Sequence, residues 1–193
     1  VTDEITIKKF TNLPRHGIRA GKPNENFLNA YLFANAFIRS CEPFRKNVGL
    51  LMFEFSRFYP SDFAHGRDFM DALDQFLEKI PKGWPYGVET RNKHFLHPDY
   101  FAMLSRHGVA HVYNNWADMP SVAEQMALPG SQTNPALCGA RFLLAPGRKY
   151  QDAVDLFSPY DRVKEPNPEA RAAGAKLIAD GVSAGGQRST FIY

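Results

Sequence analysis

Five short apolar runs recur along the chain, and each of the first four ends in polar or charged residues before a stretch of helical periodicity begins. Strands and helices that alternate in this way are typical of a parallel sheet with covering helices. In such folds, ligands bind at the carboxyl ends of the strands. The chain is therefore predicted to be an α/β protein, with strands in Val48–Phe55, Tyr86–Asn92, Val109–Asn115, Cys138–Ala145 and Ser189–Tyr193.

The stretches around these runs carry helix signals. Gly66–Ile80 has the clearest periodicity, and a further helix containing Ala153 and Phe157 is expected after the turn at Pro146-Gly147. Residues 1–7 are predicted to be the end of a strand. Capping residues and apolar spacing predict four more helices: from Asn24 or Asn26 to about Phe44, from Pro98 to before Gly108, from Ser121 to about Leu128, and from Asn167 to before Gly181.

No linker long enough to separate two domains is present, so residues 1–193 are predicted to be one domain. Its four to five parallel strands could form an open doubly wound sheet. They could equally be the later part of a (β/α)₈ barrel, which typically needs about 250 residues. Because Tyr193 ends the chain inside a strand-like run, we expect a fragment of a longer protein.

Composition limits the partners. Lys plus Arg total 23 and Asp plus Glu total 20, which gives a net charge of +3 without any long run of like charge. Nonspecific nucleic-acid binding is therefore not indicated. Cys41 and Cys138 lie far apart in apolar stretches, as reduced thiols of a cytoplasmic protein do. With no long apolar segment or signal peptide, no membrane partner is predicted, and the oligomeric state stays open.

Charged residues interrupt two of the apolar runs. Glu54 lies near the end of the first run, where an unpaired buried carboxylate would cost several kcal/mol and so needs a partner or a function. Glu89 and Arg91 are two residues apart in the second run, so their side chains project to the same side of a strand. We predict Glu54 and Glu89 as catalytic residues and Arg91 as substrate-binding, with a structural ion pair as the alternative.

Three later residues complete the predicted site. Asn115, after Asn114, could present an amide to a ligand, although Asn is also common in turns. Arg141 interrupts the fourth run, which implies an interior carboxylate or an anionic ligand. Arg148 follows at a strand-to-helix turn, where a cation near a helix N-terminus suits an anion and a solvated turn is the alternative. We predict Asn115, Arg141 and Arg148 as substrate-binding residues.

No motif indicates a cofactor or metal. His94-x-x-His97 with Asp99 has loose metal-like spacing but lacks the frames that make a zinc prediction strong. Glycine-rich phosphate loops and nucleophile elbows are absent from the sequence as well. No metal site is predicted, and a cofactor stays unknown.

Several segments together resemble the YecE-like proteins, also called domain-of-unknown-function family 72. Arg141, ahead of Gly147 and Tyr150, is similar to a later Arg-containing strand of that family. The resemblance spans about Ile5 to Tyr193 and implies a TIM-like barrel, of which this chain is the later part, but no activity. It is carried by Val48–Phe55 with Phe58, by His107–Ala110, and most specifically by Tyr86, Val88, Glu89 and Arg91.

Two classes of function stay open. The first is an enzyme, a hydrolase or isomerase of a polar or phosphorylated small molecule, in which Glu54 and Glu89 exchange protons and the arginines bind an anion. The second is a binding module for nucleic acid or protein, which predicts a basic surface stripe. A third reading is that these charges only specify the fold.

Overall fold

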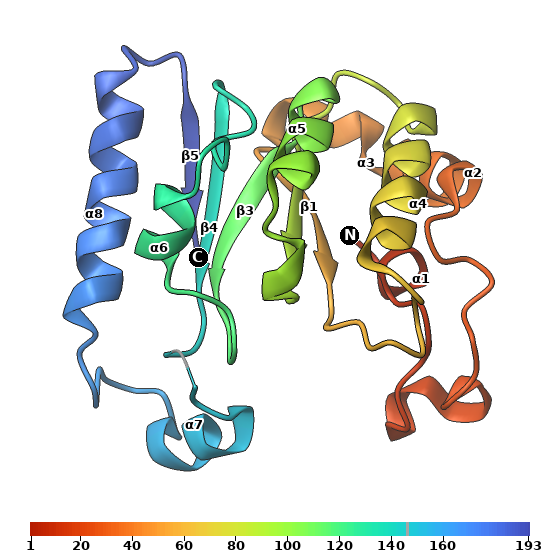
Figure 1. Cartoon of the computed structure of the whole chain (residues 1–193), viewed down its shortest axis with the longest axis horizontal. Helices are drawn as coiled ribbons and strands as arrows, with labels where there is room; N and C mark the ends of the chain where they lie inside the picture. Colours follow the sequence, from red (N-terminus) through yellow and green to blue (C-terminus); the bar gives the residue numbers. More distant parts are fainter. Residues whose placement is uncertain (146) are drawn as a thin grey trace. The chain divides into compact units, whose positions relative to one another are not determined.

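Strands and helices alternate along the chain from residue 51 onward, which confirms the α/β class (Figure 1). The computed structural model describes residues 1–145 and 147–193. The chain divides into two compact units, residues 1–90 and residues 91–193. The strands are β1 (Leu51–Phe55), β2 (Tyr86–Thr90), β3 (Ala110–Asn115), β4 (Leu137–Phe142) and β5 (Ser189–Ile192), and the helices among them are α4 (Gly66–Lys79), α5 (Pro98–Arg106), α6 (Val122–Ala127), α7 (Tyr150–Phe157) and α8 (Pro168–Ser183).

In the first unit, β1 and β2 pair in parallel, and α4 joins them. The helix begins after His65, whose backbone N–H donates to the Asp68 carboxylate at 2.9 Å. Its buried stripe packs on β1, where the Phe76 ring lies 5.2 Å from that of Phe53 and Phe69 lies 5.2 Å from Phe55. Burial of each such ring contributes roughly 1.5–3 kcal/mol, so this contact holds the helix on one face of the strand pair.

A helical run of changing pitch precedes β1. It consists of α2 (Ala30–Leu32), a π-helical segment η2 (Phe33–Ile38), α3 (Arg39–Cys41) and a 3₁₀ segment η3 (Glu42–Asn47). The run begins at Asn29, whose Oδ1 accepts a hydrogen bond from the Leu32 backbone N–H at 2.9 Å. The predicted start at Asn24 or Asn26 is wrong, because the Asn24 amide instead donates to the carbonyl oxygens of Glu4 and Ile7.

Residues 1–7 contain the single-turn helix α1 (Asp3–Thr6) and not the end of a strand. Its first turn is capped by the Thr2 hydroxyl, which accepts from the Glu4 N–H at 3.4 Å, and Ile5 is fully buried. The alternation of Thr and Ile that suggested a strand therefore reflects one short turn with a buried side. Two further 3₁₀ segments, η1 (Pro14–Arg19) and η4 (Lys93–Phe95), lie in loops.

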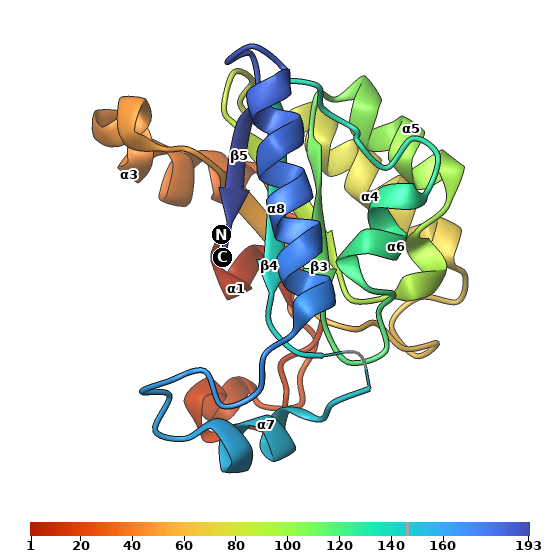
Figure 2. The ribbon, with the colours of Figure 1, turned by 90° about the vertical axis from the view of Figure 1, so that its left-hand side faces the viewer.

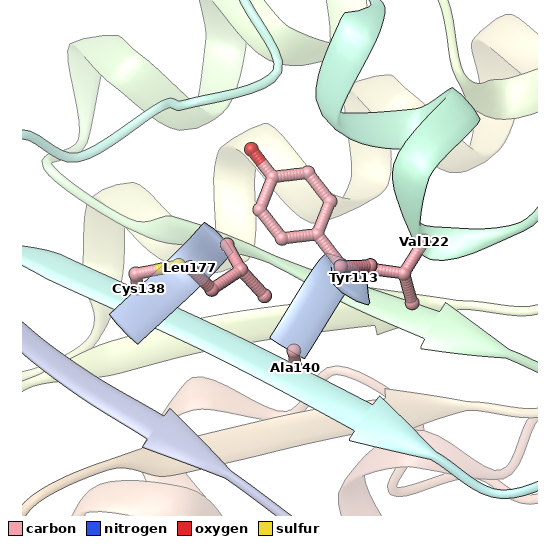
Figure 3. Packing of buried hydrophobic residues seen from close by; sticks show 6 residues of the cluster. Tyr113, Val122, Cys138, Ala140 and Leu177 are labelled. Atoms are coloured by element: carbon pink, nitrogen blue, oxygen red, sulfur yellow. The ribbon is translucent and has the colours of Figure 1, made fainter. Parts of the chain in front are cut away.

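In the second unit, β3, β4 and β5 pair in parallel, and α6 and α8 cover one face (Figures 1 and 2). The predicted caps are confirmed: Ser121 forms a capping box with Glu124, and Asn167 Oδ1 accepts from the Ala170 N–H at 3.0 Å. Figure 3 shows the buried cluster beneath these helices, which consists of Tyr113, Val122, Cys138, Ala140, Ala173 and Leu177.

Two predicted boundaries in this unit are wrong. Gly181 lies inside α8 and not after its end. A glycine fits there because a Cβ at this position would come within 2.6 Å of Thr190 Oγ1 on β5. The fourth strand ends at Phe142 and not at Ala145. Beyond its end, the Leu144 N–H still donates to the carbonyl of Asn115, the last residue of β3, at 3.0 Å. Pro146 of the predicted turn lies outside the described residues.

A closed barrel is not confirmed, because neither the pair β1–β2 nor the set β3–β5 closes on itself within the described residues. Among the helices of those residues, none has both the length and the apolar character that a membrane span requires.

Candidate functional site

Two predicted catalytic residues lie side by side in the first unit. The parallel register pairs Glu54 of β1 with Glu89 of β2. Because Phe53 and Phe55 face α4, and side chains alternate along a strand, Glu54 and Glu89 project from the opposite face. Adjacent strands lie about 4.8 Å apart, so two side chains in register are neighbours. Glu89 is fully buried, whereas Glu54 is partly exposed.

A second polar pair lies in the second unit. The register of β3 and β4 sets Asn114 beside Arg141, on the face opposite Tyr113 and Ala140. Asn114 is fully buried, whereas Arg141 is partly exposed. The buried Gln125 side chain fixes the backbone here, since its amide nitrogen donates to the Asn114 carbonyl at 2.6 Å and its oxygen accepts from the Asn114 N–H at 3.3 Å. Gln125 is thus a positioning residue for Asn114.

The four residues of these pairs share one structural position. Each is the last residue but one of its strand, and each points away from the helices that cover its strands. In a parallel α/β arrangement, this position lies near the carboxyl end of the strand, where ligands bind. The arrangement combines two carboxylates in one unit and an amide with a guanidinium in the other.

Asn115 and Arg148 meet at a different place. Both line a cavity of about 400 Å³ at the carboxyl ends of β3 and β4, beside α7 and the start of α8. Asn115 points to the helix-covered face, where its Oδ1 accepts from the Val122 N–H at 2.9 Å. Arg148 forms an ion pair with Glu165 at 2.6 Å. Asn115 is therefore separated by strand alternation from Arg141, and Asn114 takes the place beside that arginine.

Arg91 has an aromatic partner. Its guanidinium carbon lies 3.9 Å from the centroid of the Trp116 ring, and that ring lies 6.4 Å from the ring of Tyr150. A guanidinium over an indole face is held by cation–π attraction worth about 0.5–1 kcal/mol at exposed sites. In such stacking, the N–H groups of the guanidinium point within its plane, away from the ring face.

Other ionisable groups of the second unit are buried in its interior. Burial lowers the pKa of His111 to about 4, and the neighbouring Gln125 side chain offsets only part of that shift. Neither ring nitrogen of His111 reaches hydrogen-bond geometry with a residue that the structure describes. Burial also raises the pKa of the Cys138 thiol to about 11 and that of Tyr113 to about 12. At neutral pH all three groups are uncharged, which suits a packed core.

The histidines and acids give no metal centre in the described part of the chain, where no three such side chains gather. His97 instead caps α5, because its Nδ1 accepts from the Asp99 N–H at 3.4 Å. The Nδ1 atom of its exposed ring also lies 3.6 Å from an Asp99 carboxylate oxygen. Helix capping therefore accounts for the presence of His97 and Asp99 at this spacing.

Sequence reasoning missed Gln125 and Trp116 and did not separate Asn114 from Asn115. All six residues of β3 are buried, so polarity does not alternate along this strand and its two faces look alike in the sequence. The one usable signal for Gln125 was its place in a short amphipathic helix. The residue is fully buried there, and a buried amide needs hydrogen-bond partners. Trp116 gave no signal of its own beyond its place after the strand.

Solved structures of other proteins have a similar fold. Two crystal structures of a DUF72 family protein from Enterococcus faecalis match with a TM-score of 0.53 at 16% and 15% identity, covering 81% of this chain and 56% and 58% of theirs. A DUF72 family protein from Thermotoga maritima matches with a TM-score of 0.52 at 17% identity, covering 81% and 55%. The chain thus spans little more than half the length of these structures, and the likeness shows the fold alone. No curated protein matches the chain.

The family model described as "Protein of unknown function DUF72" matches residues 10–171, well over half of the chain. The resemblance expected from the strands of Glu54, Glu89 and Arg141 is therefore confirmed: the chain belongs to the DUF72 family.

Proposed function

We propose that this protein is an enzyme, a hydrolase or isomerase of a polar or phosphorylated small molecule, with Glu54 and Glu89 as its acid and base. The observation that carries the proposal is their register pairing on β1 and β2, next to the carboxyl ends of both strands. Two carboxyl groups in register on one face of a strand pair are close enough to act on the same ligand.

The chemistry open to such a pair follows from its spacing. Two carboxyl groups on neighbouring strands can share a proton, or can flank one scissile bond as acid and base. The partly exposed Glu54 is the member that meets solvent and substrate, and the buried Glu89 is shielded from water. A positioned acid or base contributes about 10²–10⁴-fold to a rate.

The second unit supplies candidate contacts for an anionic or polar group. Arg141, with Asn114 beside it, and Arg91 on Trp116 are the ones that we favour, because both residues are partly exposed. Arg148 and Asn115 form a further candidate at their shared cavity. We also propose that these strands belong to a TIM-like barrel, the fold that the family resemblance implies; a single domain and a cytoplasmic location stay predictions.

The test is a turnover screen with phosphate monoesters, sugar phosphates and glycosides, following phosphate or sugar release and mass-spectrometric detection of isomers. For any substrate found, Glu89→Gln and Glu54→Gln are each expected to lower kcat/KM by at least about 100-fold. Glu25→Gln removes an exposed carboxylate of the same unit and is expected to leave kcat/KM unchanged.

Melting temperatures separate a chemical role from a structural one. Because Glu54 is partly exposed, Glu54→Gln is expected to melt within a few degrees of the unsubstituted protein while losing activity. Turnover that survives in both glutamine variants, or the absence of turnover throughout the panel, would contradict the proposal.

A further inference from the structure

A separate cavity of about 300 Å³ lies in the first unit, at the carboxyl end of β1. Its walls come from residues 6–12, from Arg15 and Gly21 near η1, and from the loop that follows β1. Figure 1 shows that loop leaving β1 toward the segment between α1 and η1. The volume is at the lower end of the range for small-molecule sites.

The cavity is strongly basic. Four cations line it, and the only lining carboxylate among the described residues is that of Asp62, which accepts from the Tyr59 N–H at 2.8 Å. The Arg15 guanidinium nitrogen lies 3.9 Å from the Asp3 carboxylate, so the two form a loose ion pair that is exposed to solvent. The four cations are Lys8, Lys9, Arg15 and Arg57.

The two lysines differ in how they are held. The Lys8 ammonium lies 3.7 Å from the centroid of the Phe63 ring, which fixes its place by cation–π contact. Lys9 is exposed. Neither lysine forms an ion pair with any residue in the described ranges. Like charges gathered around one hollow concentrate anions there.

From this cluster we infer that the cavity binds the phosphate group of a small organic phosphate. Hydroxyl and amide groups of Thr11, Asn12 and Ser56 lie in the same wall and can complete the hydrogen bonds of phosphate oxygens. The Phe58 and Tyr59 side chains supply an apolar and aromatic wall for the rest of the ligand, and Tyr59 is 58% exposed. The binding site is independent of the carboxylate pair and stands whether or not turnover is found.

Isothermal titration calorimetry with inorganic pyrophosphate, in low salt, tests the inference. The unsubstituted protein is expected to bind, and Lys9→Gln to bind about fivefold more weakly, the effect of removing one charge near a surface. Lys9 makes no described ion pair, so this variant is expected to keep its melting temperature. Lys46→Gln, at an exposed lysine of η3 outside the cavity, is the matched control and is expected to bind as the unsubstituted protein does.

Three outcomes would overturn the inference. One is the absence of binding at millimolar pyrophosphate. The second is equal weakening by Lys9→Gln and Lys46→Gln, which would indicate a diffuse charge effect. The third is tight binding of a single-stranded RNA 12-mer that pyrophosphate does not compete with, which would assign the basic residues to nucleic acid.

Discussion

Two strand pairs in this molecule carry polar side chains at the same structural position with opposite chemistry. The first unit has Glu54 beside Glu89, and the second has Asn114 beside Arg141. On the helix-facing sides of the same strands, the core contacts come from Phe53 and Phe55 in the first unit and from Tyr113 and Ala140 in the second. The helix-facing side chains therefore make the packing contacts. On the opposite faces, the first unit carries two carboxyl groups and the second carries an amide with a guanidinium. Under the proposed function, these polar pairs serve a ligand.

The largest effect is expected when residues on the two opposite faces of β1 are substituted one at a time. Phe53→Ala should lower the free energy of unfolding by about 3–5 kcal/mol, because the ring packs against Phe33, Phe76 and Tyr86. Glu54→Gln, one residue along the strand, should change it by less than about 1 kcal/mol. Urea denaturation measures both values. A cost for Glu54→Gln equal to that for Phe53→Ala would make this face structural and end the contrast.

The next prediction concerns the second unit, where the free energy of unfolding is expected to depend on pH through His111. His111 has a pKa of about 4 in the folded protein against an ordinary 6.5, because burial disfavours its charged form. Above pH 6.5 both states are neutral; between pH 6.5 and 4 only the unfolded chain takes up the proton. Stability is therefore lost as pH falls through this window, by up to about 1.4 kcal/mol per pH unit and about 3 kcal/mol in all.

His111→Phe keeps the ring contacts with Tyr100, Phe101 and Tyr113 and is expected to flatten this pH dependence. His94→Phe, at an exposed position, is the control and should leave the slope as it is. Urea midpoints at pH 7.5, 6 and 5 provide the measurement. An unchanged slope in His111→Phe would mean that another group is responsible for the acid sensitivity.

Smaller effects are expected from two glycines of α8. Gly181→Ala should destabilise by about 1–3 kcal/mol, because its Cβ would lie 2.6 Å from Thr190 Oγ1. Gly174→Ala places its Cβ 3.7 Å from the Phe142 ring, an ordinary contact, and should stabilise by about 0.5–1 kcal/mol through helix propensity. Thermal melts measure both changes. Equal shifts for the two variants would show that α8 packs more loosely on β5 than these distances indicate.

The sequence predicted what is locally encoded and missed what depends on tertiary contact. The start of α8 at Asn167 and the whole of α4 follow from caps and apolar spacing, and both are confirmed. Gly181 was misread as a helix end because its role depends on a strand that approaches α8 in the folded chain. α1 was misread because a single turn is too short to display a period.

The candidate site shows the same limit. Strand ends were predictable from the apolar runs, so Glu54, Glu89 and Arg141 could be selected from the sequence alone. The register that joins Glu54 to Glu89 could not, because parallel pairing is set by packing of the covering helices and not by a hairpin turn. The exchange of Asn115 for Asn114 beside Arg141 has a related cause, since both faces of β3 are buried.

The most direct test of the central claim is a double-mutant cycle on Glu54 and Glu89, measured as free energies of unfolding in urea at pH 7. Side chains in register on neighbouring strands interact, so the effect of Glu54→Gln plus Glu89→Gln should differ from the sum of the single effects by at least about 0.5 kcal/mol. Additivity within about 0.3 kcal/mol would show that the two carboxyl groups do not form one site.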